Sequence, residues 1–219
     1  MKRLTTFIIV TLLFLVGCAN TQVAESQREV RPHHYGSFNE VAYMSTSLLY
    51  YETTLAGLES RTENIVRGRM GNDARVVFQY SELRPNMRIT GHNIVSFEVL
   101  EVFQGNLSAG DIIRIAEPYY IMDDVLLTHS NYMPSIPNQE YIFFLLNPLT
   151  AEVPEGYEGA FFVVHGERSR FPVPSNASNV QGFSADAQDF AAVEFGLGSY
   201  ANVEVYMSLW QEVINAYID

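Results

Sequence analysis

Apolar and polar residues change pattern several times along the chain of 219 residues, and each pattern predicts a different element. The first is a short apolar run, Phe7–Val16, which follows Lys2 and Arg3. A positive start, an apolar stretch and then small residues are typical of an export signal. A membrane-spanning helix needs about 20 apolar residues, so this run is too short to be one. We therefore expect residues 1–17 to be a signal peptide.

A polar stretch without periodicity follows at residues 18–40 and predicts a flexible tether. The folded domain is then expected at residues 41–219. It begins with a short helix at Thr53–Arg61, because Thr53 or Thr54 is a suitable N-cap and the apolar residues after it share one face.

Beyond this helix, apolar stretches of strand length predict a mainly β domain. Ile94–Phe103 is the longest of them. Its apolar positions change parity between Val99 and Leu100, which predicts a β-bulge and the strong coiling that a small barrel needs. Tyr141–Leu146 is apolar throughout, so we expect it to be buried on both faces or to lie at the centre of the sheet. The other predicted strands are Ile65–Met70, Ala74–Tyr80, Ile112–Ala116, Ala160–His165 and Ser169–Val173.

Turn signals predict how these strands are connected. Gly, Asn and Asp at 71–73 separate the first two strands and predict a hairpin. Gly166 separates the last two in the same way, and Pro172 predicts that the final strand lies at a sheet edge. Glu117–Gln139 contains several prolines, and we interpret it as a long loop with one helical turn at Met122–Leu127.

The chain closes with a predicted helix at about 200–218, after a connection at 174–199 that is rich in Ser, Asn, Gly and Ala. Asn202 is a suitable N-cap for it. Its apolar stripe is expected to pack on the β domain, with Trp210 as the largest anchor, or else to bind a partner. The stripe consists of Val203, Met207, Trp210, Ile214 and Tyr217.

Composition and charge agree with one folded domain. The chain is 47% hydrophobic and 13% aromatic, which is ample for a packed core. Its formal net charge is −12, which argues against nucleic acid or an anionic lipid surface as the main partner. Solubility accounts for most of this charge.

The end of the apolar signal, Leu15-Val16-Gly17-Cys18, resembles the lipobox of bacterial lipoproteins. The resemblance implies that Cys18 is lipidated, with palmitate among the chains, and becomes the new N-terminus. The protein would then be anchored in the cell envelope on the outer face of a membrane. Ala19 implies the outer membrane in a host that has two. Cys18 is the only cysteine, so the domain is expected to contain no disulfide; the alternative is an ordinary signal peptide with a chance cysteine.

Four strand sequences resemble a second family, the netrin-like domains, which are the OB-fold barrels of the tissue inhibitors of metalloproteases. Many exported bacterial proteins share the series. It implies a small OB-like barrel with a short N-terminal helix and a C-terminal amphipathic helix packed on it. Those inhibitors bind the protease zinc through a disulfide-fixed N-terminal cysteine, which this chain lacks, so that activity does not carry over. Gln104 also stands where a lysine is usual. The matching segments are 64–69, 97–105, 110–115 and 139–145.

Motifs that carry chemistry are not found in the sequence: it has no nucleophile elbow, zinc-protease motif, P-loop or EF-hand loop. We therefore assign no catalytic residue, metal or cofactor, and we do not expect the scattered His92, His129 and His165 to form a metal site. The candidate binding residues are the aromatic pair Tyr119 and Tyr120, the acidic pair Asp123 and Asp124, and Arg67 and Arg69, which share one strand face. Each has a structural alternative, namely core packing, a solvated loop and ion pairing with acidic side chains.

These features favour a membrane-anchored, non-catalytic exported lipoprotein, a binding module for a protein or envelope component. A different class is an envelope hydrolase that uses carboxylates of the 117–139 loop, Asp123 and Asp124, with a histidine such as His129. A third is a purely structural envelope protein. The sequence names neither the ligand nor the partner.

Overall fold

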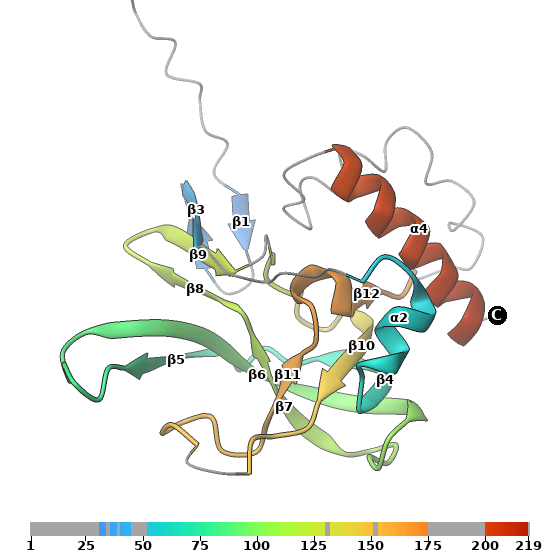
Figure 1. Cartoon of the computed structure of the whole chain (residues 1–219), viewed down its shortest axis with the longest axis horizontal. Helices are drawn as coiled ribbons and strands as arrows, with labels where there is room; N and C mark the ends of the chain where they lie inside the picture. Colours follow the sequence, from blue (N-terminus) through green and yellow to red (C-terminus); the bar gives the residue numbers. More distant parts are fainter. Residues whose placement is uncertain are drawn as a thin grey trace, which may run out of the picture.

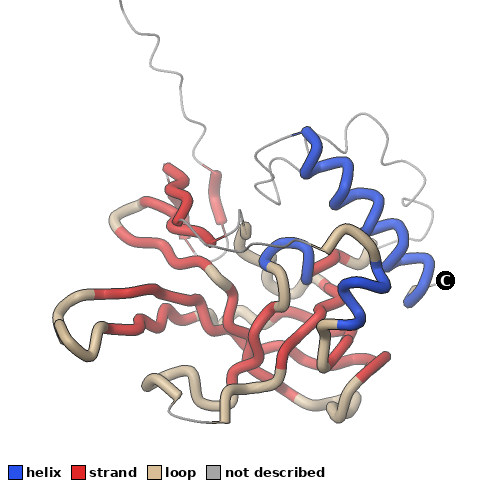
Figure 2. The backbone as a smooth tube through the Cα atoms, viewed as in Figure 1, coloured by secondary structure: helices blue, strands red, loops and turns tan. Residues whose placement is uncertain are grey.

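The computed structural model describes residues 31–33, 36–38, 40–44, 52–129, 132–150, 153–174 and 200–218. The expected signal peptide, Cys18 and nearly all of the connection at 174–199 lie outside these residues. Within them the chain is mainly β, as expected, with helices on one side (Figures 1 and 2).

Five strands close into a barrel (Figure 1). Their order is β11-β7-β6-β4-β10, and pairing between β10 and β11 completes the circle. The β7–β11 pair is parallel and the other pairs are antiparallel. The strands are β4 (Asn64–Met70), β6 (Arg88–Gln104), β7 (Ile112–Glu117), β10 (Glu140–Leu146) and β11 (Ala160–Val163).

The coiling of the barrel comes from irregular pairing between β4 and β6. Gly68 of β4 pairs with Val99 of β6, and Arg67 of β4 pairs with Glu101 of β6. Leu100 of β6 therefore has no partner in the register. This is the bulge that the parity change in the sequence predicts, and that prediction is confirmed. Gly68 is needed here, because a Cβ atom at this position would lie 2.1 Å from the Glu98 carbonyl oxygen.

Two apolar clusters, one on each face of β10, hold the domain together. One brings together side chains of β4, β6, β7 and β10, including Phe97 and Phe143, whose rings meet edge to face at 5.2 Å. The other places Ile142 and Phe144 of β10 against the C-terminal helix. β10 is buried at every position from Tyr141 to Leu145, which confirms that this strand is buried on both faces. Each fully buried large apolar side chain contributes about 1.5–3 kcal/mol.

The C-terminal helix, α4 (Tyr200–Tyr217), packs on the barrel as expected. Trp210 is 3% exposed, and its indole Nε1 donates to the Pro172 carbonyl at 2.9 Å. The prediction of Asn202 as N-cap is wrong, because the helix begins two residues earlier. The short helix α2 (Leu55–Ser60) lies beside α4, and the Thr54 hydroxyl caps it by accepting from the Gly57 N–H at 3.2 Å.

Both predicted hairpins that flank this barrel are wrong. β5 (Arg75–Tyr80) pairs with the first half of the 17-residue β6, whereas β4 pairs with the second half, so β4 and β5 do not pair with each other. β11 and β12 (Arg170–Pro172) are separated by the 3₁₀ helix η1 (Gly166–Ser169), and each pairs with β10 instead. β12 is last in the sheet order, which confirms the predicted edge position of Pro172.

The interpretation of Glu117–Gln139 as a loop with a helical turn is also wrong. The segment contains the antiparallel hairpin of β8 (Tyr119–Met122) and β9 (Val125–His129). Asp123 and Asp124 form its turn with φ values of 52° and 60°, the left-handed conformation that two-residue hairpin turns require.

Strands also occur near the N-terminal end of the described chain. β3 (Glu40–Met44) pairs in parallel with β9 and completes a three-stranded sheet, β3-β9-β8. β1 (Arg31–His33) and β2 (Gly36–Phe38) pair with each other inside the stretch where we expected a tether. Among the described residues, neither helix is both long and apolar enough to span a bilayer.

Candidate functional site

A groove of about 840 Å³ runs beside β5, and this volume falls in the range of about 300–1,000 Å³ that is typical of ligand sites. One wall consists of the consecutive residues Val76 to Leu83, and the other of Pro154, Glu155 and Gly156. Successive residues of a strand point to opposite faces, so a groove lined by all of them follows the strand edge. β5 pairs only with β6 among the described strands, which leaves its other edge toward the groove.

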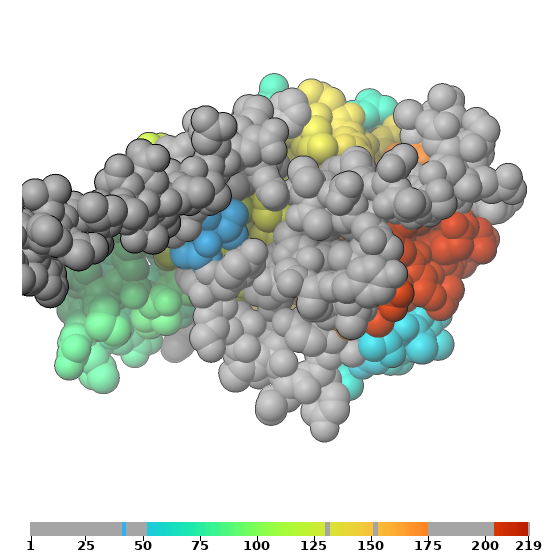
Figure 3. Space-filling view, turned by 90° about the horizontal axis from the view of Figure 1, so that it is seen from above, coloured from blue at the N-terminus to red at the C-terminus, as the bar shows by residue number. Residues whose placement is uncertain are grey.

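Large apolar side chains are exposed on the part of the molecule that carries this groove. We call residues 75–90, which are β5, its turn and the start of β6, the β5–β6 arm. The arm projects from the barrel on the side away from α4 (Figures 1 and 3). It holds five of the eight exposed large apolar residues in the described chain, so the exposure is concentrated in one patch rather than scattered. They are Val76 (41% exposed), Tyr80 (46%), Leu83 (94%), Met87 (47%) and Ile89 (56%).

Aromatic packing fixes the base of the arm to the body. The Phe78 ring meets Tyr120 of β8 edge to face at 5.2 Å, and the Arg88 guanidinium lies 4.3 Å from the Phe78 ring centre. Gly91 leaves room for this contact, since a Cβ atom there would lie 2.7 Å from the Tyr120 ring. The arm therefore leaves the barrel in a defined direction.

The opposite wall of the groove is also held in place. The Tyr157 hydroxyl donates to the Val77 carbonyl at 3.1 Å and lies 2.9 Å from His92 Nδ1. Arg75 Nη2 donates to the Gly156 carbonyl at 3.3 Å. These bonds join the 153–159 loop to β5, so the groove exists before any ligand binds.

Carboxylates lie at both ends of the groove. Glu155 precedes Gly156, which contacts Val77 near the start of β5, and Glu82 follows the end of the strand. Among the described residues they are the only charged ones that line the groove, and neither Arg75 nor Arg88 belongs to the lining. The groove therefore has an apolar middle and two acidic ends.

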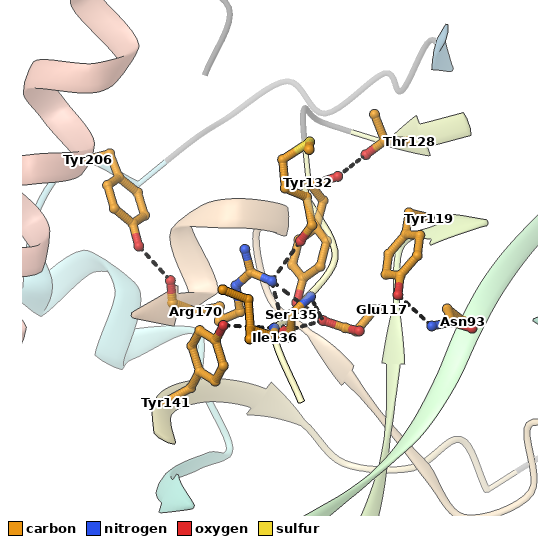
Figure 4. Close-up of polar contacts among 11 residues, drawn as sticks. Asn93, Glu117, Tyr119, Thr128, Tyr132, Ser135, Ile136, Tyr141, Arg170 and Tyr206 are labelled. Atoms are coloured by element: carbon orange, nitrogen blue, oxygen red, sulfur yellow. Dashed lines mark hydrogen bonds and ion pairs between the residues drawn. The ribbon is translucent and has the colours of Figure 1, made fainter. Parts of the chain in front are cut away.

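A buried polar network lies elsewhere, between β7, β12 and the 132–136 segment (Figure 4). Arg170 Nη1 lies 3.6 Å from Glu117 Oε1, and both side chains are at most 1% exposed. The same Glu117 oxygen accepts from the Tyr132 hydroxyl at 2.7 Å and from the Ser135 backbone N–H at 3.2 Å. The Arg170 guanidinium lies over the Tyr132 ring at 4.5 Å. Burial raises the pKa of Glu117, and the charge of Arg170 opposes that rise.

This network is enclosed, so it positions the chain rather than a ligand. It fastens the 132–136 segment to the barrel, and Arg170 Nη1 also donates to the Met133 carbonyl at 2.6 Å. A buried ion pair of this kind adds little net stability over an apolar replacement, but removing one partner is strongly destabilising.

The predicted aromatic and acidic sites are not brought together. Tyr119 and Tyr120 are 1% and 7% exposed and pack in the interior, where the Tyr119 hydroxyl accepts from Asn93 Nδ2 at 2.5 Å. Asp123 and Asp124 are exposed in the β8–β9 turn. His129 lies at the other end of β9, roughly 16 Å from Asp124 at the rise of a strand, so the geometry does not assemble the proposed hydrolase set.

The two arginines predicted to share a face do so, and acidic neighbours surround them. Arg67 Nη1 lies 3.3 Å from Glu101 Oε2, and Arg69 Nη2 lies 3.1 Å from Glu140 Oε1. Glu140 contacts both arginines. The ion-pairing alternative is therefore the one that the structure shows.

Two of the three scattered histidines do meet. The rings of His92 and His129 stack at 6.0 Å, and His129 Nε2 lies 2.9 Å from the Thr90 hydroxyl. Burial, together with the nearby His129, lowers the pKa of His92 to about 4. His165 lies elsewhere, near Glu52, Arg61 and Arg168. No group of three or more metal-ligating side chains occurs in the described ranges.

Sequence reasoning missed the groove. Its best signal was that both parities of β5 are apolar, at Val76, Val77 and Phe78, although a strand with one solvated face normally alternates. The second wall was not detectable, because Gly156 is 81 residues from Arg75 in sequence. Comparison with models of known protein families finds no match, and comparison with curated proteins finds none either.

Proposed function

We propose that this protein is a lipid-anchored binding module of the cell envelope, which holds a partner in the β5 groove of an OB-like barrel. The location of the groove carries the proposal. OB barrels bind ligands on the face of their second and third strands and with the loops between strands one and two and between strands four and five.

The barrel offers the corresponding parts. In chain order, its first and second strands are β4 and β6, and its fourth and fifth are β10 and β11. The connection from β4 to β6 contains β5, and the connection from β10 to β11 contains Pro154, Glu155 and Gly156. Both walls of the groove therefore come from the two connections that an OB barrel uses for binding.

The anchor in the proposal depends on the Leu15–Cys18 motif and the apolar run before it. Two acyl chains on Cys18 would give stable attachment, which one chain does not. To test it, the wild-type chain and Cys18→Ala are expressed in a bacterium with radiolabelled palmitate. We expect label and detergent-phase partition for the wild type alone. The anchor would be refuted if Cys18→Ala incorporated as much palmitate label as the wild type, or entered the detergent phase to the same extent.

The binding role is tested by cross-linking in intact cells. We expect the wild type to form a discrete cross-linked adduct. Val76→Lys and Tyr80→Lys should each lower its yield, because a partner that covers the groove would have to bury an unpaired lysine charge. Ile112→Lys is the matched control, since Ile112 is 75% exposed on β7, outside the groove. Equal adduct from all four proteins would place the binding surface elsewhere.

A further inference from the structure

The open edge of β5 has the properties of a docking site for another strand. In an antiparallel pair, every second residue of a strand directs its N–H and C=O away from its partner. About three of the six residues of β5 therefore face this edge. Val77 is one of them, and its carbonyl already accepts from the Tyr157 hydroxyl, so the groups open to another strand lie mainly in the second half of β5. The groove follows β5 from Val76 to the end of the strand and continues to Leu83.

This edge has few of the residue types that usually prevent pairing, although the 153–159 loop covers its start. Natural edge strands carry lysines, prolines or inward-pointing charges. β5 has one charged residue, Arg75 at its first position, and it has no lysine or proline. The Arg75 guanidinium is turned to the Gly156 carbonyl. From Val76 to Tyr80 the strand is uncharged and mostly apolar.

The charges of the groove specify the chemistry of the occupant. Glu155 and Glu82 lie beside the start and beyond the end of β5, so a strand along this edge would meet a carboxylate near each of its ends. At about 3.3 Å per residue, six or seven residues cover the distance. Opposite-charge pairs stabilise neighbouring strands, whereas like charges directly opposite destabilise them.

We propose that the edge of β5 binds an extended peptide segment by strand addition, with apolar side chains in its middle and a lysine or arginine near each end. This inference rests on the proposed function and names the class of partner for the same groove. Main-chain hydrogen bonds would supply affinity, and the side-chain contacts would supply selectivity.

The test uses the full-length chain in detergent and fluorescein-labelled peptides, with binding followed by fluorescence anisotropy. The probe is Lys-Val-Thr-Val-Thr-Val-Lys. One control peptide has glutamate at both ends, and a second is N-methylated at every central residue, which removes its main-chain donors. We expect the glutamate and N-methylated peptides each to bind about tenfold more weakly than the probe, or worse.

Protein variants separate charge from strand pairing. The double variant Glu82→Gln/Glu155→Gln is expected to reduce the difference in affinity between the lysine-ended and the glutamate-ended peptide. Val76→Lys is expected to weaken binding of the lysine-ended peptide about tenfold, whereas Ile112→Lys should leave the affinity for this peptide unchanged. The thermal midpoint of each variant shows that it is folded. Strand addition would be overturned if the N-methylated peptide bound as tightly as the probe. It would also be overturned if Ile112→Lys reduced the affinity for the probe as much as Val76→Lys does.

The two proposals fail in different ways. If the N-methylated peptide binds as well as the probe but groove variants still lose the cellular adduct, strand addition is wrong and the binding role stands. If the peptides behave as expected but the adduct is insensitive to groove variants, the edge accepts a strand and the proposed cellular role is wrong.

Discussion

The burial of Glu167 in η1 should make this carboxyl destabilise the folded state as the pH rises from about 4.5 to 7. The residue is 3% exposed, and its Oε2 has no hydrogen-bond partner among the residues that the structure describes. Burial raises the pKa of Glu167 from 4.5 to about 7, against the opposing effects of a backbone hydrogen bond and of Arg168. The folded protein therefore binds this proton more tightly than the unfolded chain does.

The sign and size of the effect follow from this difference in pKa. Below about pH 4.5 the carboxyl is protonated in both states, so it adds no pH dependence. Between pH 4.5 and 7 the unfolded chain releases the proton first, so the contribution of Glu167 to the free energy of unfolding falls. The total loss is about 3 kcal/mol, at 1.36 kcal/mol for each pKa unit.

Urea denaturation of the wild type and Glu167→Gln, at pH 4.5 and at pH 7.5, measures this loss. Other titrating groups are common to both proteins, so the difference between their unfolding free energies isolates Glu167. We expect Glu167→Gln to gain about 3 kcal/mol relative to the wild type over this interval. Glu82→Gln, which removes an exposed carboxyl, is the matched control. A wild-type minus Glu167→Gln difference that does not change with pH would refute the argument.

Three further predictions concern stability. His92 should contribute a loss of stability as the pH falls from 6.5 to about 4, because the unfolded chain takes up a proton that the buried ring resists. His92→Gln should remove this contribution, and the difference between wild-type and variant unfolding free energies in urea at both pH values measures it. Trp210→Ala should lower the unfolding free energy by about 3–5 kcal/mol through the cavity it leaves between α4 and the barrel, as denaturant midpoints would show. Glu117→Gln should lower it by about 3–5 kcal/mol, whereas Leu83→Lys should change it by less than about 0.5 kcal/mol, both by calorimetry.

Local features of this fold were predictable because they are encoded in neighbouring residues. The bulge at Leu100 follows from a parity change within one strand, and the burial of β10 on both faces follows from an unbroken apolar run. The packing of α4 follows from helical periodicity that includes Trp210. Each of these needs only a few consecutive residues.

Features that depend on partner choice were not predictable. A turn signal at 71–73 predicts a hairpin of β4 and β5, but β6 is long enough to pair with both, and this length outweighs the turn. The Asp123-Asp124 turn was missed because neither residue is the glycine that usually marks a two-residue hairpin.

The candidate site was hidden for the same reason. Its walls meet through contacts such as that of Val77 with Tyr157, 80 residues apart, and no local pattern encodes them. The residues that the sequence did suggest, such as Tyr119 and Arg67, are conspicuous by type but are engaged in packing and ion pairs. Exposure, not residue type, distinguishes the groove.

The parallel contact between β7 and β11 has a consequence for the order of assembly. β11 is the last barrel strand in the chain and bonds to both β7 and β10. During synthesis from the N-terminus, the barrel sheet therefore keeps two unpaired edges until residue 163 has been made. Folding dominated by such distant pairings is slow, and its intermediates are prone to aggregation. The apolar face of β10 that packs on α4 stays uncovered until α4 has been made. The late stages of synthesis are therefore the interval in which a chaperone would matter most.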